Sequence, residues 1–148
     1  MLLITCFIFG LLGSLTWAGS QWFCYKFYED RLNFQEAEGE CQEKWRGHLA
    51  SVKSEKESLL IDAYVTGKNI ESHNVWIGLQ RDEGSNLHGG WRWTDGSSSR
   101  YSRWFKGEPN NVSNKEYCVG LYPLSGSLYW NDLNCRNKLP FLCKWTPA

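Results

Sequence analysis

The stretch NFQEAEGECQEKWRGHLASVKSEKESLLIDAYV, residues 33–65, contains two helix-start patterns in succession. Asn33 and Glu36 have the spacing of a capping box, in which each side chain accepts the backbone N–H of the other residue. Apolar residues then recur at helical spacing: Phe34, Ala37, Cys41 and Trp45. This pattern predicts a helix over residues 34–46.

The capping pattern repeats at Ser54 and Glu57, ahead of a second run of apolar residues. It predicts a second helix over residues 55–65. Between the two helices, HLASV at residues 48–52 is expected to form an extended connector.

Short runs rich in β-formers make up most of the remaining chain. One lies before the helices, at residues 22–28. The others follow them: VWIGL (75–79), GWRWTD (90–95), YCVGLY (117–122), LYW (128–130) and PFLCKW (140–145). Two helices followed by short antiparallel strands indicate an α+β fold. About twenty residues between Asp95 and Glu116 show no regular period, and loops of that length in compact domains are usually functional or disordered.

The length of 148 residues suits one domain with a substantial core. Residues 2–12 form an apolar run, and Thr16 and Ala18 are small residues with the spacing of a cleavage site. We therefore predict a signal peptide over residues 1–18 and a mature domain over residues 19–148. A membrane anchor is the alternative, but a span needs about 20 apolar residues and this run ends sooner. We expect a secreted, extracellular protein without membrane insertion.

Cleavage would remove Cys6 and leave an odd set of cysteines: Cys24, Cys41, Cys118, Cys135 and Cys143. In an oxidising compartment such a set forms at most two disulfides within the chain, and one sulfur remains free or joins another chain. The spacing alone does not choose the pairs. Structural zinc is not predicted, because there is no C-x-x-C motif and the three histidines are scattered.

The charges give no whole-molecule case for nucleic-acid binding, because sixteen basic residues balance sixteen acidic ones. Locally, WRWTDGSSSRYSRWFK at residues 91–106 interleaves basic and aromatic residues. Such a run is compatible with polyanion binding, but alternating aromatics are also typical of the buried face of a strand. We favour the strand interpretation.

Hard oxygen donors gather in two segments near the long loop: Glu108, Asn110, Glu116, Asn131 and Asp132. Ca²⁺ takes about 6 to 8 oxygen ligands and tolerates irregular geometry, whereas three carboxylates without a cation would repel one another. The alternative is ordinary turn chemistry, since Asn, Asp and Pro are common in turns. Pro109 favours calcium, because a cis X-Pro bond would turn both neighbouring side chains toward one ion.

Carboxylates and amides that bind an ion keep further hydrogen-bonding capacity for two neighbouring sugar hydroxyls. The donor set therefore predicts a calcium-bridged sugar site. The chain contains no G-x-S-x-G, H-E-x-x-H or glycine-rich phosphate motif, and so we predict a binding protein and not an enzyme.

The chain resembles the C-type lectin-like domain family through motifs that cover nearly all of the mature chain: NFQEAEGECQEKWRGHLASV, WIGL, EPN, EYC, WND and PFLCKW. The resemblance implies the C-type lectin fold, with two helices, small antiparallel sheets and a long calcium-binding loop. It also implies disulfides that join Cys41 to Cys143 and Cys118 to Cys135.

Carried over to this sequence, the family's principal calcium and sugar ligands are Glu108, Asn110, Glu116, Asn131 and Asp132, and Pro109 is cis. A glutamate-proline-asparagine order accompanies mannose, fucose or N-acetylglucosamine, whereas a glutamine-proline-aspartate order accompanies galactose. The resemblance thus implies a secreted lectin with one principal Ca²⁺, which binds glycans or glycoproteins with terminal mannose-type sugars.

Three positions depart from the family pattern. Asn111 and Tyr117 stand where members with an auxiliary calcium site commonly have acids, which argues against a second calcium ion. Cys24 lacks the upstream partner of longer members, so that it either joins two chains in a homodimer or stays a buried free thiol. Asn111-Val112-Ser113 is an N-glycosylation sequon, which is either glycosylated or unused.

A non-lectin function is the alternative. Domains that resemble this one also occur as secreted proteins of the regenerating type, as antibacterial proteins, and as binders of proteins or of mineral or ice surfaces. Those proteins often lack the complete set of calcium ligands, and this chain has it, which favours the lectin.

Overall fold

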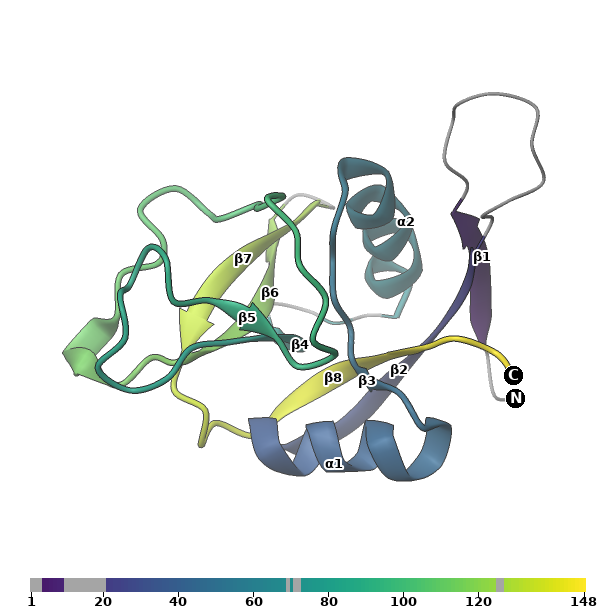
Figure 1. Ribbon diagram of the computed structural model, residues 1–148, viewed down its shortest axis with the longest axis horizontal. Helices are drawn as coiled ribbons and strands as arrows, with labels where there is room; N and C mark the ends of the chain where they lie inside the picture. The colour runs from purple at the N-terminus through teal and green to yellow at the C-terminus, as the bar shows by residue number, and fades with distance from the viewer. Residues whose placement is uncertain (1–3, 10–20, 69, 71–72, 125–126) are drawn as a thin grey trace.

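The computed structural model describes residues 4–9, 21–68, 70, 73–124 and 127–148 (Figure 1). The elements are β1 (Thr5–Phe9), β2 (Gln21–Leu32), α1 (Phe34–Trp45), β3 (His48–Leu49), α2 (Glu55–Thr66), β4 (Val75–Gln80), β5 (Arg92–Trp93), the 3-10 helix η1 (Val112–Asn114), β6 (Cys118–Leu124), β7 (Ser127–Leu133) and β8 (Leu139–Trp145). The predicted α+β class is confirmed. Within the described ranges, no helix is long and apolar enough to cross a membrane.

Both helices begin where the capping patterns predict. Asn33 Oδ1 accepts the Glu36 N–H at 2.9 Å, and Glu36 Oε2 accepts the Asn33 N–H at 3.1 Å. At the start of α2, Ser54 Oγ accepts the Glu57 N–H at 3.1 Å. Each helix end differs from the prediction by one residue: Arg46 turns left-handed with a φ of 52° and ends α1, while α2 runs one residue further.

The strands form one sheet in the order β1-β2-β8-β4-β6-β7, with β3 paired to β8 and β5 paired to β4. These pairings are antiparallel except that of β4 with β8, where Trp76 lies opposite Phe141. The parallel pairing joins the antiparallel groups that we expected as small sheets. The expected connector at residues 48–52 begins with the short strand β3.

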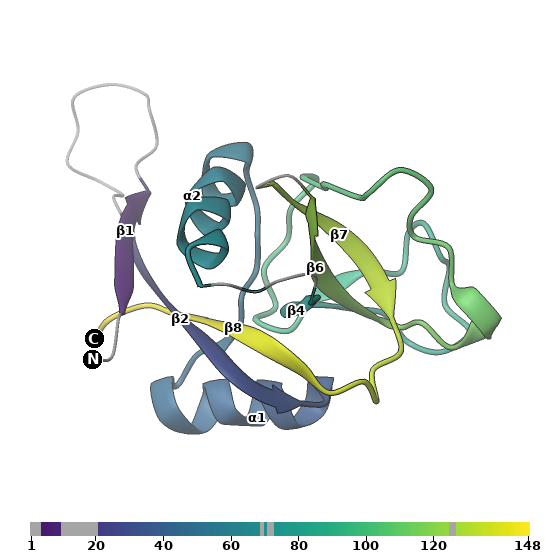
Figure 2. The same cartoon turned by 180° about the vertical axis from the view of Figure 1, so that it is seen from behind.

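The two helices lie on opposite sides of the β2–β8 pair, as the views from front and back agree (Figures 1 and 2). Cys41 and Cys143 join α1 to β8, and Cys118 and Cys135 join the start of β6 to the segment before β8. Both disulfides that the resemblance implied are therefore confirmed. In the chain-entropy model, closures of these lengths stabilise the fold by about 4.7 and about 3 kcal/mol.

The prediction for Cys24 concerns the mature chain and stays a prediction, but with residues 1–18 present this cysteine has a partner within the chain. Cys24 forms a disulfide with Cys6, and none of the cysteines, all of which lie in the described ranges, is free. The reason is that Thr5–Phe9 pairs with β2 as an antiparallel strand, in which Cys6 lies directly opposite Cys24. The predicted cleavage site at Thr16 and Ala18 lies outside the described residues, and the signal peptide stays a prediction.

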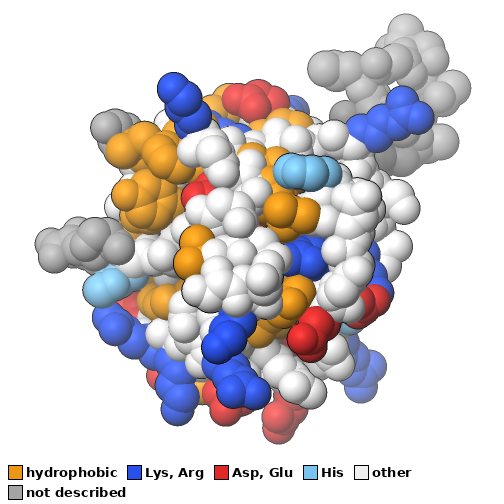
Figure 3. Space-filling model, turned by 90° about the vertical axis from the view of Figure 1, so that its left-hand side faces the viewer, with side chains coloured by type: hydrophobic (Ala, Val, Ile, Leu, Met, Phe, Trp, Pro, Cys, Tyr) orange, Lys and Arg blue, Asp and Glu red, His pale blue; other side chains and the backbone are white. Residues whose placement is uncertain are grey.

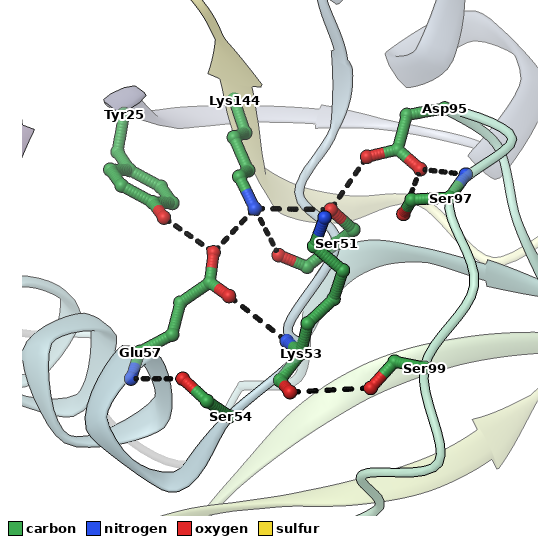
Figure 4. Close-up of polar contacts among 9 residues, drawn as sticks. All are labelled: Tyr25, Ser51, Lys53, Ser54, Glu57, Asp95, Ser97, Ser99 and Lys144. Atoms are coloured by element: carbon green, nitrogen blue, oxygen red, sulfur yellow. Dashed lines mark hydrogen bonds and ion pairs between the residues drawn. The ribbon is translucent and has the colours of Figure 1, made fainter. Parts of the chain in front are cut away.

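A buried ion pair connects α2 to β8 (Figure 4). Lys144 Nζ pairs with Glu57 Oε1, and the two side chains are 4% and 5% exposed. Lys144 also donates to Ser51 O at 3.0 Å, and the Tyr25 hydroxyl donates to Glu57 Oε1 at 2.5 Å. Glu57 Oε2 accepts the Lys53 N–H at 2.9 Å. The charges are thus paired and hydrogen-bonded, which is the condition for burying them at tolerable cost.

The alternating aromatics of residues 91–106 have different degrees of burial. Trp93 in β5 is 6% exposed and packs edge-on against Trp130, with ring centroids 5.4 Å apart. This confirms the strand interpretation for Trp93. Trp91 lies before β5, is half-buried, and packs at the border of the same core cluster.

Candidate functional site

The long loop between β5 and β6 is attached to the edge of β7 by backbone hydrogen bonds. Trp130 N–H donates to Arg103 O at 2.8 Å, and Phe105 N–H donates to Trp130 O at 2.9 Å. Glu108 N–H then donates back to Phe105 O at 2.9 Å, which closes a turn. The Glu108–Pro109 peptide bond that follows is cis, as the resemblance implied.

Asp132 in β7 holds the backbone that follows the cis bond of the Glu108-Pro109-Asn110 tripeptide. The residue is fully buried, its Oδ1 accepts the Asn110 N–H at 3.0 Å, and its Oδ2 accepts the Asn111 N–H at 2.7 Å. Asn110 Nδ2 in turn donates to Glu108 Oε1 at 3.0 Å. The structure therefore brings Glu108, Asn110 and Asp132 together from two segments.

Glu116 faces the same tripeptide from the other end of the loop. Its Oε2 accepts the Val112 N–H at 2.9 Å, and the same N–H lies 3.3 Å from Asn110 Oδ1. The Glu116 N–H donates to Asn111 Oδ1 at 3.1 Å. Side-chain acceptors thus close the loop on itself around η1.

Asn131 stands apart from the other four predicted ligands. It is half-buried, lies opposite Gly120 in the pairing of β7 with β6, and makes no side-chain hydrogen bond with the described residues. Successive side chains of a strand point to opposite faces, so Asn131 points away from the buried Asp132. Among the described residues, no group of three or more His, Cys, Asp or Glu side chains forms a metal site by itself.

The electrostatics of the acids nevertheless favour a cation. Burial, the adjacent Asp132 carboxylate and the charge of Glu116 raise the pKa of Glu108 to about 7. Burial also raises the pKa of Glu116, with the Val112 N–H opposing the shift and Asp132 adding to it. Glu108 Oε2 is buried and has no hydrogen-bond partner among the described residues. Mutually repelling acids and an unpaired buried acceptor are features that a bound cation would satisfy.

The donor set fits Ca²⁺ better than a transition metal. It consists of carboxylate and amide oxygens, which Ca²⁺ prefers, and it contains neither the imidazole nor the thiolate ligands typical of zinc or copper. Asn110 is hydrogen-bonded to Glu108 and to Asp132, and Glu116 and Asn110 both approach the Val112 N–H. Asn131 is the neighbour of Asp132 along β7.

Arg81 supports the loop, and we did not single it out from the sequence. It is 5% exposed, and its guanidinium donates to Glu116 O and to Ser85 O, each at 3.2 Å. The guanidinium also lies over the rings of Tyr117 and Trp91, 4.5 and 5.4 Å from their centroids. A charged residue directly after the buried strand β4 is the one sequence signal that could have identified Arg81.

The end of the molecule that carries the long loop lies on the left of Figure 1 and faces the viewer in Figure 3. Hydrophobic side chains form separate patches between uncharged areas, and most charged side chains lie in the lower half of this view (Figure 3). The surface is therefore mixed and not dominated by one sign of charge.

Comparison with known proteins places the chain in a family. The profile described as Lectin C-type domain matches residues 30–145. This chain belongs to the C-type lectin domain family. "C-type lectin lectoxin-Lio1" of Erythrolamprus poecilogyrus is 44% identical to this C-type lectin domain protein over 132 residues, which cover 88% of this chain and 78% of that protein. A "C-type lectin mannose-binding isoform" of Oxyuranus scutellatus is 40% identical over 129 residues, covering 86% and 80%.

Solved structures agree with this assignment. The structure of human lithostathine superimposes on the C-type lectin domain with a TM-score of 0.77 at 34% identity, covering 84% of this chain and 92% of that chain. Domains of this family are generally non-enzymatic binding domains, they typically bind calcium, and their carbohydrate-recognition members bind glycans. The predicted family and fold are therefore confirmed, while the residues of the site stay a prediction.

Proposed function

We propose that this C-type lectin domain is a secreted, calcium-dependent carbohydrate-binding protein that prefers mannose-type sugars: mannose, fucose and N-acetylglucosamine. The observation that carries the proposal is the pair of hydrogen bonds from the Asn110 and Asn111 amides to Asp132. These bonds hold the segment of Glu108, Pro109 and Asn110 next to the buried carboxylate of Asp132. The mannose-binding name of the 40% identical relative supports the same sugar class.

The calcium ion would be held by Glu108, Asn110, Glu116 and Asp132, and Asn131 would join as the fifth predicted ligand by turning its side chain toward them. When bound, the ion supplies an electropositive centre that accepts two neighbouring sugar hydroxyl oxygens. Glu108 supplies a hydrogen-bond acceptor and Asn110 supplies a donor, on either side of Pro109. Asp132 fixes the backbone that carries Asn110, and so the order of donor and acceptor is set before the sugar arrives.

The expected partners are glycans or glycoproteins with terminal mannose-type sugars, with no part for nucleic acid. The predicted signal peptide over residues 1–18 supports an extracellular location for the mature domain, residues 19–148. One shallow site should bind a monosaccharide with a Kd of about 1 mM.

Chromatography on mannose resin tests the proposal. The folded protein should be retained in millimolar calcium and released by a chelator. Glu108→Gln removes one ligand charge and should weaken calcium binding by about tenfold or more. Glu43→Gln removes a charge from an exposed position on α1 and should bind like the unaltered protein. A folded protein that passes through the resin at millimolar calcium would refute the lectin and favour the non-lectin alternative.

A further inference from the structure

Residues 91–104 line most of a cavity that the calcium site does not use. The cavity has a volume of about 570 Å³, and it extends from the loop before β5 to Trp130 in β7. This volume lies in the range of about 300 to 1,000 Å³ that is usual for small-ligand sites. None of the five predicted calcium ligands lines this cavity.

Aromatic rings form one wall of the cavity. Trp91 and Trp104 pack with ring centroids 5.1 Å apart, and Trp104 and Tyr101 pack edge-on against Trp130 at 5.7 and 5.9 Å. These side chains combine a large apolar face with a polar tip. A ligand with both an apolar face and polar edges, such as a sugar ring, matches this wall.

Unused polar groups lie beside the aromatic wall. Ser98 and Ser102 line the cavity, are exposed, and have hydroxyls without a hydrogen-bond partner among the described residues. The cavity thus offers two hydroxyls to a ligand that is rich in oxygen.

The charge of the cavity is one-sided. Its lining contains Arg92, Arg100 and His88 and no Asp or Glu, although the whole chain has as many acids as bases. The guanidinium of Arg92 is already bound to both carboxylate oxygens of Asp82, at 2.6 Å each. Arg100 forms no ion pair or hydrogen bond with the described residues. Arg100 is therefore the uncompensated charge of the cavity, and it favours an anionic group.

We propose that this cavity is a second sugar site, which binds acidic glycans without calcium. Its aromatic wall packs against the apolar face of a sugar ring, the serine hydroxyls bind the ring hydroxyls, and Arg100 pairs with a carboxylate or a sulfate. None of these contacts requires the acids of the calcium loop. Chelation therefore separates this site from the lectin site proposed above.

Titration calorimetry in the presence of a chelator tests the proposal with three tetrasaccharides. Hyaluronan tetrasaccharide carries carboxylates, chondroitin 6-sulfate tetrasaccharide carries carboxylates and sulfates, and chitotetraose is neutral. At least one of the two acidic probes should bind at least about tenfold more tightly than chitotetraose. The comparison of the two acidic probes shows which anion Arg100 prefers. Binding should weaken at about 0.5 M salt because an exposed charge is screened.

A matched pair of variants locates the site. Arg100→Gln should lower the affinity for the acidic tetrasaccharides by about tenfold, while the affinity for mannose in calcium stays within about twofold of the unaltered protein. Arg136→Gln removes the same charge from an exposed position outside the cavity, and it should have no effect. Absence of acidic-glycan binding, equal affinity for the neutral probe, a requirement for calcium, or equal effects of the two variants would overturn the proposal. None of these outcomes depends on whether the protein binds mannose.

Discussion

Lys144 in β8 and Glu57 in α2, 87 residues apart in the chain, form an ion pair in which both side chains are almost fully buried. Burial lowers the pKa of Lys144, and the Glu57 carboxylate opposes this shift. Ser51 and Tyr25 complete the hydrogen bonding around the pair (Figure 4). Removal of one partner would leave the other charge buried and uncompensated.

Lys144→Met should therefore lower the free energy of unfolding by about 3 to 5 kcal/mol, because Glu57 would keep its buried charge without a cation. Urea unfolding measures this loss. Lys56→Met, at an exposed position on α2 beside Glu57, should change the free energy of unfolding by no more than about 0.5 kcal/mol. Equal effects of the two substitutions would show that the ion pair does not stabilise the fold.

Asp95 gives the stability a dependence on pH. Burial alone would raise the pKa of Asp95, but hydrogen bonds from Ser51 and Ser97 and the charge of Lys144 outweigh it and hold the pKa below its usual value. A pKa that is lower in the folded state stabilises the fold above the unfolded pKa of about 3.9, and the stabilisation is lost as the pH falls through the folded pKa.

Asp95→Asn should therefore lower the free energy of unfolding by about 1 kcal/mol at neutral pH, a modest value because the carboxylate is only partly buried and solvent screens it. The difference from the unaltered protein should shrink below about pH 4. Urea unfolding at several pH values measures it. Glu83→Gln, at an exposed acid without a side-chain partner among the described residues, serves as the control. A difference that stays constant from neutral to acid pH would contradict the assignment.

The order of acid and amide around Pro109 should decide the sugar. The double variant Glu108→Gln and Asn110→Asp exchanges the two groups and keeps the net charge, so calcium affinity should stay within a few-fold. The preference should move from mannose to galactose, because the exchange reverses which hydroxyl must donate. Inhibition by a series of monosaccharides tests this, and an unchanged order of sugars would count against the proposed site.

Asn111 should act as a positioning residue for the calcium loop. It has a left-handed φ of 49°, and its Oδ1 accepts the Glu116 N–H. Asn111→Ala loses this acceptor and places alanine in a strained conformation, and should weaken calcium binding by about tenfold. Asn111→Asp keeps an acceptor and tolerates the conformation, and should bind calcium within a few-fold. Both variants remove the glycosylation sequon, so that a difference between them, measured by calorimetry, is not due to a glycan.

The state of Cys24 should depend on whether residues 1–18 are present. The chain with residues 1–18, unfolded without reductant, should show no reactive thiol, because Cys6 and Cys24 are joined. A protein that begins at Gly19 should show one thiol per chain or run as a disulfide-linked dimer. Thiol titration and non-reducing electrophoresis distinguish these states. A free thiol in the chain that keeps residues 1–18 would contradict the Cys6–Cys24 pairing.

The parts of the fold that were predictable from the sequence are local. Asn33 and Glu36, like Ser54 and Glu57, interact within a single helical turn, and their spacing alone predicts where each helix starts. The chemical types of the site ligands were also visible. The disulfide pairs came from the family resemblance, because spacing does not determine connectivity.

The remaining features depend on contacts between distant segments. In the sequence, Lys144 looks like an ordinary polar residue at the end of a strand. Its partner Glu57 is brought to it only when the chain folds. The parallel pairing of β4 with β8 likewise has no local pattern. In the site, the chemistry of Asp132 was predictable, but not that both of its oxygens bind backbone amides of the loop.

The antiparallel pairing of Cys24 with Trp145 places the start of β2 beside the end of β8, at the opposite side of the domain from the long loop (Figures 1 and 2). A copy of the domain attached to a bead or a scaffold where β2 starts and β8 ends would keep the long loop facing the solvent. Copies mounted side by side would then all face one way, and a multivalent array of weak sites could engage a branched surface polysaccharide much more strongly than one copy.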